Sequence, residues 1–147
     1  MKGYITYDTS VIISRGLSDL PDTFLWSSVV QVELSASAKD ETQRKQLDRL
    51  FNAYAKDNSL IYPSVEDWQL AGKILFWLTQ KRRKTDGGKL VKLKPGISQR
   101  MAMDVLLAVS ARRWDATIVV DNWEDFKAIQ HYCKGLKIKR ASEFFHK

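Results

Sequence analysis

The sequence of 147 residues predicts an α/β fold with a mostly parallel central sheet. Two observations support this class. Short apolar runs alternate with segments of helical periodicity, and the strongest runs, YITYD at 4–8 and ATIVV at 116–120, are apolar on both faces. Strands of a parallel sheet have this composition because helices cover both faces. The length suits a single domain spanning residues 1–147.

The first half of the chain is expected to supply two strands and three helical segments. Residues 4–8 form the first strand, and Thr9 or Ser10 can cap the helical turn that follows. TFLWSS, residues 23–28, is predicted as the second strand, and the serines at its end can cap the next helix. Apolar residues recur at helical spacing within 39–57, which predicts an amphipathic helix with one apolar stripe.

The middle of the chain contains a short strand, a long helix and a basic segment. LIYP, residues 60–63, is a candidate strand, and Ser64 opens a capping-box pattern. The helix behind it keeps its period to about residue 81. Residues 81–96, KRRKTDGGKLVKLKPG, are expected to form a basic loop insertion or a small hairpin because they contain two adjacent glycines and a proline.

The last third continues the alternation of helix and strand. A helix is expected to begin at Ser98 and to end near Asp115, directly before the strand at 116–120. DNWEDFKAIQHY then starts as a loop and becomes a short helix. LKIKR, residues 136–140, has the composition of an edge strand, and ASEFFHK supplies a last helical turn. This alternation is typical of a parallel α/β sheet.

Composition narrows the functional classes. A net charge of +7 and a pI of about 9.5 favour polyanionic partners, nucleic acid first, although a basic protein without such a partner has the same balance. A lone cysteine, Cys133, cannot form an internal disulfide and fits a reducing cytosol. No apolar run is long enough for a signal peptide or a membrane span, so a cytoplasmic protein is expected.

Seven basic residues crowd the 81–96 segment against one aspartate. Such a run can bind the phosphates of RNA, and its plainer interpretation is a solvated loop. The candidate phosphate-binding residues are Lys81, Arg82, Arg83, Lys84, Lys89, Lys92 and Lys94.

Four acids stand at positions where an isolated charge is costly. Asp8 ends the first strand and Asp121 ends the strand at 116–120, so both should open onto the carboxyl edge of the sheet, where ligands of α/β proteins bind. Glu33 and Asp104 are single acids within apolar helical stretches. A divalent cation such as Mg²⁺ or Mn²⁺ would offset the repulsion among the four.

Each of these acids also has a structural alternative. The alternatives are a helix cap for Asp8, an arginine partner for Glu33, an ion pair of Asp104 with Arg100 or Arg113, and a turn position for Asp121 before Asn122.

Three stretches resemble the motifs of PIN domains. YDTSVI resembles the opening motif, and SSVVQVEL resembles the second, in which a serine-rich strand end leads to a helical glutamate. MDVLLAVSARRWDATIVVDNWEDF resembles the third and fourth motifs together. The resemblance covers residues 4–36 and 98–130, and the order and spacing of the motifs make it fairly specific. The size and the predicted alternation of helices and strands resemble those of a compact, single-domain PIN protein of the VapC toxin type.

The resemblance implies a three-layer α/β/α fold with a sheet of four to five strands and a Mg²⁺- or Mn²⁺-dependent endoribonuclease. Its acidic triad corresponds to Asp8, Glu33 and Asp104, with Asp121 as the fourth acid and Asp125 as the fallback. Thr9, Ser10 and Asn122 would hold a carboxylate or contact the substrate. The implied partners are RNA (tRNA, rRNA or mRNA), a small antitoxin and a second copy of the chain.

The sequence leaves two other functions open. The same residues could belong to a catalytically inactive PIN-like module that binds RNA or protein. A phosphotransfer domain of the haloacid-dehalogenase or receiver type fits less well. The dehalogenase pattern needs a second aspartate two positions after Asp8, where this chain has Ser10.

Overall fold

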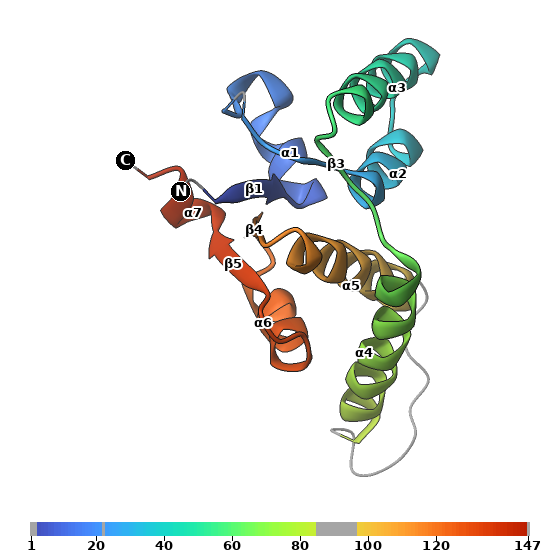
Figure 1. The fold of residues 1–147 in the computed structure, drawn as a ribbon, viewed down its shortest axis with the longest axis vertical. Coiled ribbons are helices and arrows are strands. Elements are labelled where there is room, and N and C mark those ends of the chain that lie inside the picture. The colour runs from blue at the N-terminus through green and yellow to red at the C-terminus, as the bar shows by residue number, and fades with distance from the viewer. Residues whose placement is uncertain (1–2, 22, 85–96, 147) are drawn as a thin grey trace.

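The computed structural model describes residues 3–21, 23–84 and 97–146 (Figure 1). Helices and strands alternate along the chain, as the sequence predicts. In chain order the elements are β1 (Tyr4–Tyr7), α1 (Thr9–Arg15), the 3-10 turn η1 (Leu17–Asp19), β2 (Trp26–Ser27), α2 (Ser28–Ala36), α3 (Glu41–Lys56), β3 (Leu60–Ile61), α4 (Val65–Lys84), α5 (Ile97–Arg113), β4 (Ala116–Val120), α6 (Trp123–Tyr132), β5 (Lys137–Arg140) and α7 (Ala141–Phe144).

All strand pairs within the described residues are parallel, which confirms the predicted α/β class. The main sheet has the order β1-β4-β5, and β2 and β3 form a separate two-stranded pair. The expectation of four to five strands in one sheet is therefore wrong for the described residues. The 23–28 run shortens to the two residues of β2, although the amide of Leu25 still donates to the carbonyl of Ile5 at 2.8 Å and ties β2 to β1.

The basic segment begins inside a helix and not in a loop. α4 continues to Lys84, three residues past the predicted end, so the expectation of a loop from residue 81 is wrong for its first four residues. The rest of the segment, including Lys89, Lys92 and Lys94, lies outside the described residues. None of the described helices is both long and apolar enough to cross a bilayer.

The capping box before α4 is confirmed. The amide of Asp67 donates to Ser64 Oγ at 3.1 Å, and the amide of Ser64 donates to Asp67 Oδ2 at 2.9 Å. Asp67 is 2% exposed and also accepts from Arg113 Nε at 2.9 Å. The reciprocal cap and the ion pair together fix the start of α4 against the end of α5.

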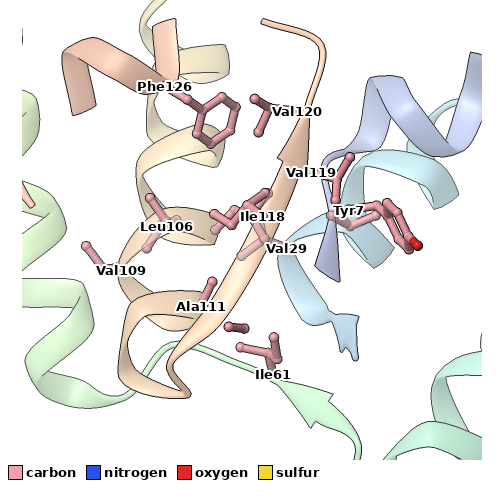
Figure 2. Packing of buried hydrophobic residues seen from close by; sticks show 14 of the residues in the cluster. Tyr7, Val29, Ile61, Leu106, Val109, Ala111, Ile118, Val119, Val120 and Phe126 are labelled. Carbon is pink, nitrogen blue, oxygen red and sulfur yellow. The ribbon is translucent and has the colours of Figure 1, made fainter. Parts of the chain in front are cut away.

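The core lies on both faces of β4 (Figure 2). Ile118 points toward α5, where Leu106 packs, and Val119 points to the other side, toward Tyr7. The ring of Tyr7 contacts Phe144 and Phe145, so α7 and the chain end cover that second face. Because both faces are covered, side chains on both sides of this strand are apolar, with the half-buried Thr117 as the exception.

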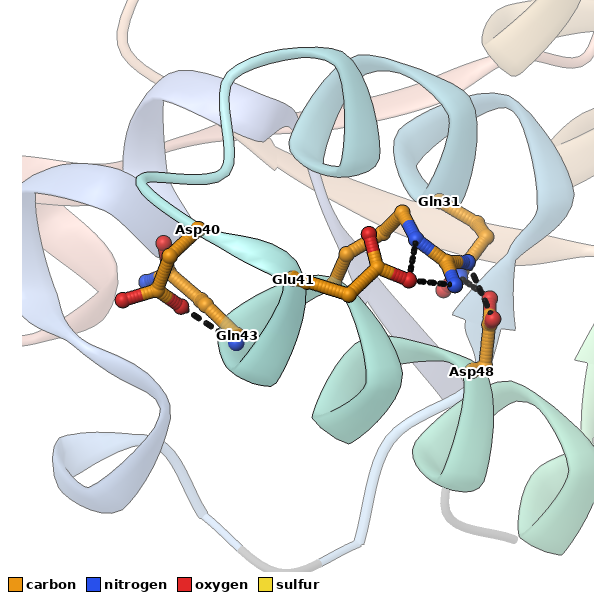
Figure 3. A network of polar contacts seen from close by, with 6 residues as sticks. Gln31, Asp40, Glu41, Gln43 and Asp48 are labelled. Atoms are coloured by element: carbon orange, nitrogen blue, oxygen red, sulfur yellow. Dashed lines mark hydrogen bonds and ion pairs between the residues drawn. The ribbon is translucent and has the colours of Figure 1, made fainter.

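A chain of polar contacts joins β2, α2 and α3, and Figure 3 shows the part of it between α2 and α3. The buried indole of Trp26 donates to Gln31 Oε1 at 2.9 Å, and Gln31 Nε2 donates to Asp48 Oδ1 at 3.4 Å. Arg44 pairs with both Asp48 and Glu41 on the exposed side of α3. The amphipathic helix predicted over 39–57 is confirmed as α3, and this chain of contacts holds it against the body of the fold.

Candidate active site

Asp8 lies at the carboxyl end of β1 and is 3% exposed. Its Oδ1 accepts from the amide of Val11 and from Ser10 Oγ, both at 2.9 Å. Asp8 itself is therefore the N-cap of α1, in place of Thr9 or Ser10. The structural alternative for Asp8, a helix cap, is correct for its Oδ1 atom. Its Oδ2 is buried and has no hydrogen-bond partner among the described residues.

The electrostatics of Asp8 follow from this position. Burial raises the pKa of its carboxyl, while the Val11 amide and the Ser10 hydroxyl oppose the rise. The negative charge of Asp121, at the end of β4, raises the pKa further. The backbone amide of Asp121 also lowers the pKa, although its geometry falls short of a full hydrogen bond to the buried Oδ2 of Asp8. Asp8 and Asp121 each follow the carboxyl end of a strand, and the two strands are parallel neighbours. The two acids therefore lie at one edge of the sheet, as predicted from the rule that strand ends of a parallel sheet meet there (the strand-end rule).

Asp104 on α5 is the most perturbed acid of this edge. Burial, followed by the charges of Asp8, Glu33 and Asp125, raises the pKa of its carboxyl to about 7, and Arg100 acts in the opposite direction. Charges this effective must be close and poorly screened. The acids of β1, α2, α5 and α6 therefore share one electrostatic environment.

Glu33 is half-buried on α2 and is held by α1. Its Oε1 accepts from Thr9 Oγ1 at 2.8 Å, and the two residues belong to different helices. Thr9 therefore holds a carboxylate, one of the two roles expected for it. No arginine pairs with Glu33 among the described residues, and Arg113, offered as a partner of Asp104, binds Asp67.

The two candidates for the fourth acid act on different members of the cluster. Asp121 is exposed, follows β4 directly and couples to Asp8, whereas Asp125 is exposed in the first turn of α6 and couples to Asp104. Asn122 between them is the N-cap residue of α6, and its side chain makes no capping hydrogen bond. Its amide group is therefore free of a capping role.

The donor chemistry of this edge fits a hard divalent cation, because every candidate ligand is a carboxylate oxygen. The buried, unpartnered Oδ2 of Asp8 is the kind of atom that a cation would satisfy. The side chains are not gathered for coordination as they stand. Within the described ranges no three His, Cys, Asp or Glu side chains form a group that could hold a metal ion.

A cavity of about 930 Å³ lies at the opposite edge of the sheet. Its walls include Tyr4 at the start of β1, Phe24, Tyr54 and Ser59. None of the acids described above lines it. The cavity is therefore separate from the acidic cluster, which consists of Asp8, Glu33, Asp104, Asp121 and Asp125.

Sequence reasoning missed a basic residue at the acidic edge. Arg140 is the last residue of β5 and pairs with Val120, the last residue of β4. Asp121 directly follows Val120, so Arg140 lies at the same edge of the sheet as Asp121. The strand-end rule that located Asp8 and Asp121 would also have located Arg140, had it been applied to the edge strand.

Comparison of the chain with protein-family models and with curated protein sequences finds no match to either.

Proposed function

We propose that the protein is a divalent-metal-dependent endoribonuclease with a PIN-like α/β/α fold, and the toxin of a toxin–antitoxin pair. Support for this proposal begins with the acids at the carboxyl edge of the parallel sheet. Their order along the chain is strand end, helix, helix, strand end, and it matches the order of the PIN motifs in YDTSVI, SSVVQVEL and MDVLLAVSARRWDATIVVDNWEDF.

The observation that carries the proposal is the buried carboxylate of Asp8. One oxygen caps α1, and the other is enclosed without a hydrogen-bond donor among the described residues. A buried carboxylate oxygen without a donor is unfavourable on its own and is stabilised by a cation. Three other acids, Glu33, Asp104 and Asp121, lie close enough to act electrostatically on one another or on Asp8.

The proposed ligands are Asp8, Asp104 and Asp121, with Asp125 as the alternative fourth acid. A bound Mg²⁺ or Mn²⁺ would lower the pKa of coordinated water and polarise the scissile phosphate. Glu33, fixed by Thr9, would orient water or a ligand at this edge. Ser10, which already donates to Asp8, would hold that carboxylate in place.

RNA is the proposed substrate because the chain is strongly basic and phosphodiesters are polyanions. The basic residues of the 81–96 segment would contact the phosphates of the substrate. Asn122, whose amide caps nothing, would contact the substrate at the start of α6. The proposal also includes a cytoplasmic location, a small antitoxin that covers the acidic site, and a homodimer.

Cleavage of a panel of tRNA and mRNA, with Mg²⁺, with Mn²⁺ and with EDTA, tests the proposal directly. We expect cleavage by the wild type that requires the metal and is abolished in Asp8→Asn. Asp19→Asn, an exposed aspartate of η1, is the matched control and should cleave normally. Metal-dependent cleavage that persists undiminished in purified Asp8→Asn protein would refute the assignment of the site.

The second candidate function is a binding module without catalysis. It is favoured by the internal contacts of the acids, since Asp8 Oδ1 caps a helix and Glu33 accepts from Thr9. A module of this kind would bind RNA or protein equally well with EDTA, and Mn²⁺ would not raise its melting temperature. The cleavage panel and a melting curve with Mn²⁺ therefore separate the two functions.

A further inference from the structure

We infer that Trp123, Lys127 and Arg140 form a cationic shelf that binds the phosphate backbone of single-stranded RNA beside the acidic cluster. The inference rests on the proposed nuclease function for the identity of the polyanion. It adds a binding surface on β5 and α6, built from other residues than the basic segment of 81–96.

The shelf is built by one aromatic ring and two cations. The guanidinium of Arg140 lies 4.7 Å from the centre of the Trp123 ring, and the ammonium of Lys127 lies 5.6 Å from it. Trp123 and Lys127 are four residues apart on α6, which brings their side chains to one side of the helix. Arg140 arrives from the end of β5, so the contact joins two elements.

The strand register places this shelf beside the acids. β5 pairs with β4 so that Arg140 is opposite Val120, and Asp121 is the next residue of β4. β1, which ends at Asp8, pairs with the other side of β4. Neighbouring strands are about 4.8 Å apart. Arg140 on β5 therefore lies one strand away from β4, which Asp121 follows, and two strands away from β1, which Asp8 follows.

The cations of the shelf are free to take an anionic ligand. Arg140 and Lys127 are exposed, and neither forms an ion pair with an acidic side chain of the described ranges. The one hydrogen bond of Lys127 within the described residues is to Gln130 Oε1, at 3.2 Å. By contrast Lys137, at the start of the same strand, is paired with Asp115 at 2.9 Å. The uncompensated charge therefore gathers at the end of β5 that faces the acids.

The stacked arginine suits a phosphate. The contact with the face of the Trp123 ring restrains the guanidinium, whose N–H donors can bind the two oxygens of a phosphodiester in a fork. Glu124 and Asp125, on the first turn of α6, would repel phosphates that lay over that turn, so only uncharged parts of the strand would pass the helix start at Asn122. They favour a path along β5, with the scissile phosphate at the acids and a neighbouring phosphate on Arg140.

Fluorescence anisotropy of a short fluorescein-labelled oligouridylate in EDTA tests the shelf without cleavage. We expect Arg140→Gln to weaken binding roughly tenfold and to lower the slope of log affinity against log salt by about 0.7, the loss of one phosphate contact. Arg140→Lys should keep the slope and lose part of the affinity, since the charge stays and the planar fork does not. Lys127→Gln should act in the same direction as Arg140→Gln.

Arg49→Gln is the matched control, because Arg49 is an exposed arginine on α3, on the other side of the molecule from β5 (Figure 1). Its affinity and salt slope should be those of the wild type. Unchanged melting temperatures would show that the β5 variants are folded. Equal affinities and slopes for Arg140→Gln and Arg49→Gln would overturn the shelf.

The outcomes separate the shelf from the nuclease. Cleavage by the wild type with an unaffected Arg140→Gln variant would remove the shelf and leave the nuclease. Oligouridylate binding that depends on Arg140, in a protein that cleaves nothing, would support the shelf and remove the nuclease. Equal displacement of the oligouridylate by polyglutamate would assign the surface to an acidic protein and overturn the RNA inference.

Discussion

Thr9 on α1 donates a 2.8 Å hydrogen bond to the carboxylate of Glu33 on α2. This bond links the helix that Asp8 caps to the helix that carries the second acid. Both side chains are half-buried, so solvent competes only partly for the bond. Thr9 therefore positions Glu33 without needing to contact the substrate.

Replacement of Thr9 tests this positioning role. Thr9→Val keeps the shape and removes the donor, and we expect roughly tenfold slower cleavage, the range found for residues that orient metal-site ligands. Thr9→Ser keeps a hydroxyl and should restore most of the rate. Cleavage rates measured at saturating Mn²⁺, with melting curves for each variant, check the prediction. Equal rates for the valine and serine variants would show that the bond does not matter for cleavage.

Asp104 should make the protein less stable as the pH rises. The folded-state pKa of its carboxyl is raised to about 7, so the folded protein holds its proton over a range in which the unfolded chain has lost it. The loss of unfolding free energy caused by ionised Asp104 is absent below about pH 4, grows between about pH 4 and 7, and is complete above about pH 7.

Asp104→Asn should therefore stabilise the metal-free protein by roughly 2–4 kcal/mol at pH 8 and by almost nothing at pH 4. Urea unfolding in EDTA at the two pH values measures the difference. Asp19→Asn, an exposed control, should show no such pH dependence. Equal stabilisation by Asp104→Asn at pH 4 and pH 8 would mean that charge is not the cause.

Mn²⁺ should raise the melting temperature of the wild type. A ligand that binds only the folded state stabilises it by about 2.7 kcal/mol at a concentration one hundred times its Kd, which is several degrees for a chain of this size. Asp8→Asn should lose the shift, because Asp8 supplies the buried unpartnered oxygen. Differential scanning fluorimetry with Mn²⁺ and with Ca²⁺ measures it. A shift of the same size in Asp8→Asn would place the ion elsewhere.

Gln31 should be important for stability and unimportant for chemistry. Its Oε1 is the acceptor of the fully buried Trp26 indole, and its Nε2 reaches Asp48 (Figure 3). Gln31→Leu leaves the indole N–H without an acceptor and should cost about 1–3 kcal/mol of unfolding free energy. Gln31→Glu keeps an acceptor and should cost less. Urea unfolding measures both, and a leucine variant as stable as the wild type would contradict the role.

The alternation of elements was predictable because it depends on local patterns. ATIVV is apolar at every position but Thr117 because helices cover both faces of β4. The Ser64–Asp67 capping box provides acceptors for its own backbone amides, so it also depends on local sequence alone. The strand number was not predictable, because β2 and β3 keep only two residues each and their extent depends on pairing across the fold. The end of α4 was missed because basic residues are good helix formers and do not end a helix.

For the candidate site, the strand-end rule found Asp8 and Asp121 from sequence alone. The contact of Thr9 with Glu33 joins residues 24 positions apart, and no local pattern encodes it. Arg140 was overlooked because KIKR has the composition of a solvated edge strand, and its stacking on Trp123 depends on tertiary structure.

Asp8 caps α1 through one carboxylate oxygen and offers the other to the candidate site, and these two roles decide which substitution should be used to make an inactive variant. Asp8→Ala would remove the carboxylate and also the cap of α1. Loss of the cap lowers the unfolding free energy by about 1 kcal/mol, and the resulting unfolding could be mistaken for loss of catalysis. Asparagine caps a helix as well as aspartate does and removes only the charge. Comparing the two replacements in a growth assay would therefore tell a poisonous activity from a merely unstable chain.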